Sequence, residues 1–249
     1  MERQQMKAML LSGILTALMT ACGAGNSTPA APGAGSASTV VPATASVDLR
    51  SAARFAILAG STVTNTGHTK VMGDVGISPG TAIDGFPPGV IHGRLYVSDR
   101  IARQAKLDLT TAYNDAMGRT HSPIKVAGNI GGQTLYAGLY ESTSSLAVSS
   151  GDLTLDARGH SEAVFLFQIA STFTMTTGRS VILTNGAQAR NVFWAVGSSA
   201  TFGTGCSFYG NLLAHQSISV GTGTVMVGRA LARTGAVTMQ RNTMVRPGR

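Results

Sequence analysis

The stretch Ala200-Thr201-Phe202-Gly203-Thr204-Gly205 alternates apolar residues with small or hydroxylated ones and then reaches a turn. Side chains of a β-strand point alternately to opposite faces, so Ala200 and Phe202 can enter a core while Thr201 points outward. The same pattern recurs at residues 146–151, 173–178, 218–223 and 236–239. The five stretches predict stacked strands with one apolar side and one side rich in threonine.

These repeats divide their residues into an inner and an outer set. The inner set is expected to be Phe173, Met175, Ala200, Phe202, Ile218, Val220, Val237 and Met239. The outer set is expected to be Thr174, Thr176, Thr201, Ser219 and Thr238.

The spacing of the repeats predicts a solenoid. The apolar pairs begin at positions 146, 173, 200, 218 and 237, which gives steps of 27, 27, 18 and 19 residues. Such a series is typical of coils of variable length stacked on one another. Further strand-like segments lie at residues 138–140, 163–169, 181–183, 191–196, 211–214 and 224–227. Three short strands per coil around one core predict a mainly β solenoid of roughly triangular cross-section.

One segment has a helical pattern instead. In residues 99–118, apolar side chains fall on one face at steps of three or four: Ile101, Ala105, Leu109, Ala112 and Ala116. Ser98 is expected to cap this helix, and Asp99 lies favourably at the positive end of its dipole. The pattern predicts one helix of about five turns packed along the solenoid wall.

The first 22 residues read as an export signal. Arg3 and Lys7 precede the apolar run 8–19, which is too short for a transmembrane helix. The small residues before Cys22 resemble a bacterial lipoprotein cleavage box, in which that cysteine becomes the lipidated first residue. The alternative is ordinary cleavage near Ala21. Either way the protein is expected to be exported, as a cell-envelope lipoprotein or a secreted protein.

The next segment is expected to be a tether. Residues 23–46 are rich in Gly, Ala, Ser and Pro, a composition that favours a flexible linker over a packed core. The predicted organisation is therefore a signal with its lipidation cysteine at 1–22, a linker at 23–46 and one solenoid domain at 47–249.

The charge and the ionisable residues exclude several function classes. The net charge is +8, but the basic residues are scattered and no aromatic residues accompany them, so nucleic acid is not an expected partner. The five histidines show no metal-ligand spacing, and no Ser/His/Asp set or convergent pair of acids stands out. We expect no enzyme activity, no cofactor and no metal.

A family resemblance adds to this interpretation. Residues 55–67 read Phe-Ala-Ile-Leu-Ala-Gly-Ser-Thr-Val-Thr-Asn-Thr-Gly, and residues 191–201 read Asn-Val-Phe-Trp-Ala-Val-Gly-Ser-Ser-Ala-Thr. These stretches, with 73–82, 85–89, 163–169, 185–189 and 228–238, resemble the microbial ice-binding (antifreeze) protein family. The resemblance implies a right-handed, discontinuous β-solenoid of triangular section with one long helix alongside, and ice bound on a flat strand face.

The resemblance also implies candidate contact residues. Family faces often carry a Thr-Ala/Gly-x-Thr/Asn element, which here resembles residues 66–69, 177–180 and 204–207, with a weaker version at 222–225. His68 and Arg179 place larger side chains inside the element. The register of the face stays open between these corners and the alternating strand residues, so the candidate ice-binding set is Thr66, Thr69, Ser149, Thr174, Thr176, Thr177, Thr201, Thr204, Ser219, Thr222, Thr224 and Thr238.

The expected function is adsorption to ice by a monomeric protein, giving thermal hysteresis and inhibition of ice recrystallisation. Two alternatives remain. One is a lipid-tethered, non-catalytic module that binds carbohydrate or another cell, whose face would carry aromatic platforms or clustered amides. The other is a structural envelope protein that has kept the fold without the affinity for ice.

Overall fold

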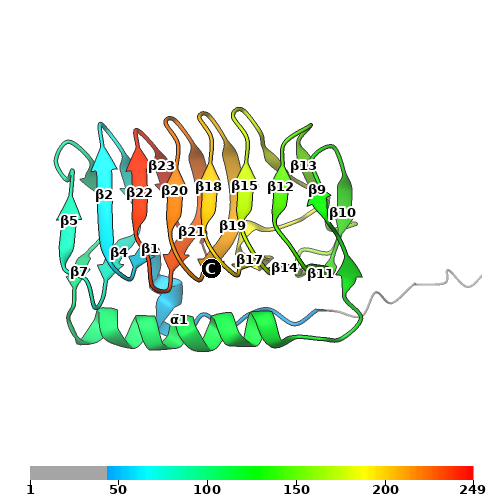
Figure 1. Ribbon diagram of the computed structural model, residues 1–249, viewed down its shortest axis with the longest axis horizontal. Helices are drawn as coiled ribbons and strands as arrows, with labels where there is room; N and C mark the ends of the chain where they lie inside the picture. Colours follow the sequence, from blue (N-terminus) through cyan, green and yellow to red (C-terminus); the bar gives the residue numbers. More distant parts are fainter. Residues whose placement is uncertain (1–43, 249) are drawn as a thin grey trace, which may run out of the picture. The chain divides into compact units, whose positions relative to one another are not determined.

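The computed structural model describes residues 44–248, which form three parallel β-sheets around one core with a single α-helix alongside (Figure 1). The predicted signal peptide, Cys22 and linker residues 23–43 lie outside the described residues. No described helix is both long enough and apolar enough to cross a membrane.

The first sheet has eight strands and carries the repeats. Its order is β5-β2-β22-β20-β18-β15-β12-β9. The strands are β5 (Ala82–Asp84), β2 (Thr62–Thr66), β22 (Val237–Gln240), β20 (Ile218–Val220), β18 (Ala200–Phe202), β15 (Phe173–Met175), β12 (Leu146–Val148) and β9 (Gly128–Asn129).

The second sheet lies under the helix and is called the helix-covered sheet. In the order β7-β4-β1-β21-β19-β17-β14-β11-β8, its strands are β7 (Leu95–Val97), β4 (Asp74–Ile77), β1 (Phe55–Ala59), β21 (Val225–Ala232), β19 (Ser207–Ala214), β17 (Val192–Val196), β14 (Phe165–Ile169), β11 (Gly138–Ser142) and β8 (Ile124–Lys125).

The third side of the solenoid is made of shorter pieces. One end is the sheet β10 (Thr134–Tyr136), β13 (Leu153–Asp156) and β16 (Val181–Thr184), and the other holds β23 (Thr243–Val245), β3 (Lys70–Met72) and β6 (Val90–Ile91). The first halves of the long strands β19 and β21 connect these two ends of the third side, because Ser207 bridges Ser180 and β21 pairs with β23. The second halves belong to the helix-covered sheet, where residues 211–214 pair with β17. Three sides around one core confirm the triangular solenoid predicted from the repeats.

The difference between long and short coils lies at one corner of the triangle. In the short coils β19 passes from the third side to the helix-covered sheet as one strand, bending at Gly210, whose φ of 128° disfavours other residues. In the long coils this corner is a loop, at residues 157–164 and again at 185–191, where η2 (Ala189–Asn191) lies. This corner joins the third side to the helix-covered sheet and does not touch the eight-stranded sheet. The strands of the eight-stranded sheet therefore stay in register whatever the coil length.

The helix carries the chain from one end of the solenoid to the other. The N-terminal coil stacks on the C-terminal coil, since β2 pairs with β22 and β1 with β21. After β7, helix α1 (Arg100–Gly118) runs the length of the stack to β8, from which the remaining coils lead back (Figure 1). Its 19 residues span about 28 Å, roughly six strand separations.

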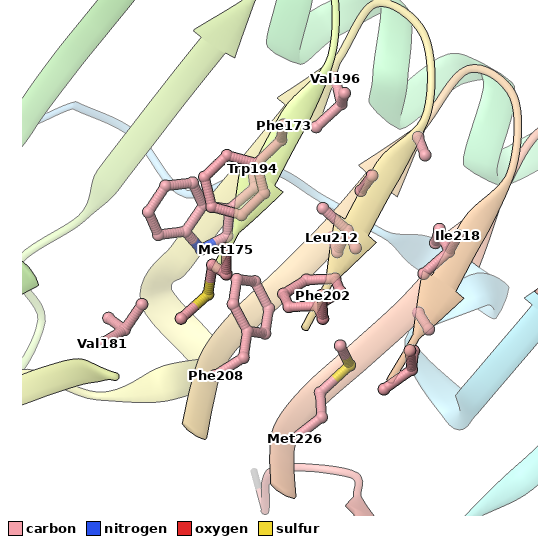
Figure 2. Packing of buried hydrophobic residues seen from close by; sticks show 14 of the residues in the cluster. Phe173, Met175, Val181, Trp194, Val196, Phe202, Phe208, Leu212, Ile218 and Met226 are labelled. Carbon is pink, nitrogen blue, oxygen red and sulfur yellow. The ribbon is translucent and has the colours of Figure 1, made fainter. Parts of the chain in front are cut away.

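The core of the solenoid is filled by aromatic and aliphatic side chains that stack in register from coil to coil. Aromatic rings at matched positions of β11, β14 and β17 stack: Tyr140 lies 5.0 Å from Phe167, which lies 4.0 Å from Trp194. In the shorter coils Leu212 and Ala230 follow in the same register. Figure 2 shows how the neighbouring rings and aliphatic side chains fill the interior. All the residues predicted to point inward are buried.

Most of the helix prediction is confirmed, and its cap is corrected. Ala105, Leu109, Ala112 and Ala116 are buried against the helix-covered sheet. The cap is Asp99 rather than Ser98, because the Asp99 carboxylate accepts a 2.7 Å hydrogen bond from the Ala102 N–H. A second short helix, η1 (Arg50–Arg54), precedes β1.

Candidate functional site

The eight-stranded sheet presents one continuous row of small hydroxylated side chains to solvent. Strand pairing places five of them side by side, and we call them the hydroxyl row: Thr64, Thr238, Ser219, Thr201 and Thr174. Asp84 ends the row on one side, and Ala147 and Asn129 continue it on the other. Because parallel strands lie about 4.8 Å apart, the row is a ladder with that spacing.

Two further rows flank the hydroxyl row, two residues away along each strand. Toward the start of the strands lie Thr62, Ala236, Ser217, Ser199, Thr172 and Ser145. Toward their ends lie Thr66, Gln240, Gly221, Gly203, Thr176 and Ser149. Every residue in both rows is small or polar, so the three rows together form a low, even surface.

Hydrogen bonds between neighbouring coils hold several of these side chains in place. Ser219 and Thr238 share a 2.8 Å hydroxyl–hydroxyl bond, and the Thr172 hydroxyl donates to Ser145 Oγ at 2.8 Å. At the far corner the Thr222 hydroxyl donates to Gln240 Oε1, also at 2.8 Å. The ladder is therefore partly ordered before anything binds to it.

Backbone packing keeps the end of the third row low. A Cβ at Gly203 would lie 2.5 Å from the Thr177 amide nitrogen, closer than any real contact. Only glycine fits there, so no side chain rises from that coil beside Thr201.

The surface is nearly free of charge. Among the described residues of these eight strands, Asp84 is the one that carries a charge, and it lies on an edge strand. Arg179, which the sequence placed inside a candidate element, pairs with Asp152 at 3.6 Å at the corner leading to the third side. His68 is exposed at the equivalent corner after β2.

The structure divides the predicted contact residues into two groups. Most lie at the surface of this sheet or its corners: Thr66, Ser149, Thr174, Thr176, Thr177, Thr201, Thr204, Ser219, Thr222 and Thr238. Thr69 and Thr224 are fully buried, so the prediction that they contact a surface ligand is wrong. Each hydroxyl is used internally: Thr69 Oγ1 accepts from the Asn242 N–H, and Thr224 Oγ1 donates to the Gly203 carbonyl.

Sequence reasoning missed several members of the array. Thr64 is in the hydroxyl row itself, and Thr62, Thr172, Ser199, Ser217 and Ser145 make up much of a flanking row. The signal was present at Thr64, because residues 62–66 alternate as the repeats do. The sequence did not show which strand lies beside Thr64, because its partner Thr238 is far away along the chain.

Features of other kinds of site are not found on this surface. None of the three rows, within residues 44–248, contains an aromatic side chain. In the same range no group of three or more His, Cys, Asp or Glu side chains is placed to hold a metal. Cys206 is buried, and burial raises the pKa of its thiol.

Comparison with known proteins gives this arrangement a family. The family model described as "Ice-binding-like" matches residues 57–245. The chain belongs to this ice-binding-like family. It is 46% identical over 195 residues to an ice-binding protein of Nostoc sp. (strain HG1), covering 78% of this chain and 72% of the relative. It is 35% identical to an ice-binding protein of Flavobacterium frigoris (strain PS1), covering 81% and 76%.

Solved structures of ice-binding-like proteins have the same fold. An ice-binding protein from an Antarctic biological consortium superposes with a TM-score of 0.81 at 57% identity, over 82% of this chain and 92% of that one. The ice-binding protein of Antarctomyces psychrotrophicus gives a TM-score of 0.78 at 40% identity, over 82% and 100%. The family and β-helical fold expected from the sequence are thus confirmed.

Proposed function

We propose that this protein binds ice through the eight-stranded sheet, and that it thereby depresses the freezing point and inhibits recrystallisation. The observation that carries the proposal is the hydroxyl row in strand register, flanked by two low rows and nearly without charge. The family membership supports ice as the ligand, since its relatives are named ice-binding proteins.

The geometry of the sheet suits a crystalline ligand. Hydroxyl groups repeat at about 4.8 Å across the strands, and outward positions repeat at about 6.6 Å along them. A two-dimensional grid can match a two-dimensional lattice, whereas a single pocket cannot. Each contact with water is weak, but many act together once the first are made.

Threonine suits the task for three physical reasons. Its β-branched side chain has few rotamers, so little conformational entropy is lost on binding. Its methyl group shields apolar surface, while its hydroxyl holds a water molecule in place. We propose that the array orders a layer of water that merges with a crystal plane.

The decisive test places one bulky side chain in the middle of the array. Thr201 is exposed and lies at the centre of the hydroxyl row. Thr201→Tyr should remove partitioning into a growing ice hemisphere and most thermal hysteresis, with an unchanged circular dichroism spectrum. The control is Thr111→Tyr, an exposed position on α1, which should keep full activity. Full activity in folded Thr201→Tyr would exclude this sheet as the ice-binding surface.

The carbohydrate-binding alternative is disfavoured by the composition of the sheet. Sugar rings stack on aromatic side chains, and none lies in the three described rows. A glycan array provides the check, and specific binding to a glycan through this sheet would favour the alternative.

We further propose that the protein acts without catalysis, as an exported monomer tethered by lipid on Cys22. The support is the order of charged, apolar and small residues before Cys22. Radiolabelled palmitate should be incorporated into the wild type in a bacterial host but not into Cys22→Ser. Labelling of neither form, with release into the medium, would instead indicate ordinary secretion. Sedimentation equilibrium tests the monomer.

A further inference from the structure

Arg229 is a buried cation without a charged partner among the described residues. It projects from β21 on the helix side, and 7% of its surface is exposed. Its Nε donates to the Ala53 carbonyl at 2.9 Å and its Nη1 to Asn211 Oδ1 at 2.6 Å. Both acceptors are neutral. Within residues 44–248 it forms no ion pair.

A second arginine, Arg190, is connected to it through Asn211. The Asn211 amide that accepts from Arg229 also donates to the Arg190 carbonyl at 3.0 Å and to the Val192 carbonyl at 3.1 Å. The Asn211 side chain therefore links the backbone of Arg190 to the guanidinium of Arg229. Both arginines line a cavity of about 380 Å³, whose other walls include Val47, Leu49, Ala53 and Phe193.

The remaining hydrogen-bonding capacity of Arg229 reaches this cavity. Its Nη2 has no hydrogen-bond partner within residues 44–248. This atom is not sealed from solvent, so it can donate to a molecule in the cavity. Burial and the charge of Arg246 lower the pKa of Arg229 to about 10, so it still carries its charge at neutral pH.

The nearby carboxylates do not compensate that charge. Glu162 pairs with Arg190 Nη2 at 2.9 Å, and its own side chain is 77% exposed. Asp48, at the mouth of the cavity, accepts from the Arg50 N–H at 2.9 Å and is 82% exposed. Neither lies within ion-pairing distance of Arg229.

We propose that this cavity binds a carboxylate that carries a small apolar group, with the carboxylate held by the Arg229 guanidinium. A guanidinium pairs with a carboxylate through charge-assisted N–H···O bonds, and Nη2 of Arg229 is available to donate them. Leaving a buried cation unpaired is costly, so an anion that pairs with it binds favourably. The apolar walls at Leu49 and Phe193 accommodate the rest of the molecule. This site is on the helix side and is independent of the proposed ice-binding sheet.

The test compares benzoate with benzamide, a neutral molecule of the same shape, by calorimetric titration and thermal melting of the purified protein. Benzoate should bind once per chain with saturation and raise the melting temperature, and benzamide should do neither. Arg229→Gln should weaken benzoate binding at least about tenfold, as expected for loss of a charge-assisted bond. The control Arg158→Gln should bind as the wild type does, because that guanidinium lies over Tyr136, away from the cavity lining.

Two more variants complete the test. Arg229→Lys should also weaken benzoate binding, because an ammonium group lacks the planar fork of the guanidinium. If neither Arg229 variant folds, Asp48→Asn carries the test: Asp48 is exposed and lines the cavity, so loss of its negative charge should tighten benzoate binding. Equal responses to benzoate and benzamide, no response to benzoate, full binding by folded Arg229→Gln, or an unchanged affinity in Asp48→Asn would overturn the proposal.

Discussion

The eight-stranded sheet and the helix-covered sheet enclose the same core but turn different side chains outward. At matched positions of the helix-covered sheet, Leu213, Leu231 and Leu58 stand in register and are fully buried under α1. On the eight-stranded sheet the equivalent ladder is threonine and serine, and it is open to solvent. Both sheets have parallel strands and buried inner faces.

The comparison shows that the backbone of a solenoid does not decide what its sides do. A ladder of leucines exposed to water would be unstable, and so it requires a covering helix. A ladder of threonines can stay uncovered, and its regular spacing is then available to a ligand. The outward residue type therefore separates the side that stabilises the molecule from the side that we propose binds ice.

The largest expected effect comes from interrupting the uncovered ladder at a position that the sequence did not single out. Thr64→Tyr should remove much of the thermal hysteresis, because Thr64 pairs directly with Thr238 and a bulky side chain there would hold ice away from that end of the hydroxyl row. Nanolitre osmometry measures the loss, and urea denaturation should show a stability within about 0.5 kcal/mol of the wild type. Normal hysteresis would confine the active surface to the other coils.

A cavity under the helix should have the opposite consequence. Leu231→Ala should lower the free energy of unfolding by about 2–5 kcal/mol, the usual cost of a buried Leu→Ala change, while folded protein keeps its activity. Chemical denaturation measures the cost. Thr238→Ala on the other sheet is the matched control and should cost far less. Similar costs for the two substitutions would contradict the division of roles between the sheets.

The helix also introduces a pH dependence of stability. Lys106 on α1 donates to the Ala232 and Arg233 carbonyls, and burial together with the charge of Arg233 lowers its pKa from 10.5 to about 7. Between these two values the unfolded chain keeps a proton that the folded protein has lost, so stability should rise with pH across this window. Below about pH 7 both states hold the proton and this contribution to the slope vanishes.

The Lys106→Met variant isolates this effect. Denaturation at several pH values between 7 and 10.5 should show a flatter dependence than in the wild type, with ice-binding activity unchanged at each pH. Parallel curves for the two proteins would show that Lys106 does not titrate in this range.

The smallest expected effect comes from making the uncovered ladder more uniform. Ser219 lies between Thr201 and Thr238, and Ser219→Thr makes the three alike and adds one methyl group to the array. Hysteresis should rise slightly, and the stability should change by no more than about 0.5 kcal/mol. A clear fall in hysteresis would show that the Ser219–Thr238 hydroxyl bond matters more than uniformity.

The sequence predicts what is local in this fold. Alternation over three residues was enough to assign the inner and outer sides of β15, β18, β20 and β22, because the period of a strand is two. The helix was equally clear from its apolar face. The cap was placed one residue early, because Ser98 and Asp99 are both good capping residues and only the Asp99 contact with Ala102 distinguishes them.

What the sequence could not predict depends on contacts between distant residues. Thr64 joins the hydroxyl row only because the first coil stacks on the last. Thr69 and Thr224 look like their exposed neighbours in sequence, but each follows a turn that directs it inward, where a backbone group from another coil uses its hydroxyl. The cavity beside Arg229 likewise requires β19 and β21 to be paired.

The stacking of the first coil on the last has a consequence for synthesis. The ribosome makes residues 62–66 long before their partner strand at 237–240. The proposed ice-binding surface therefore cannot become continuous until residues 237–240 have been made. A chain that stops before residue 237 would lack Thr238, so Thr64 would stand apart from the three remaining members of the hydroxyl row.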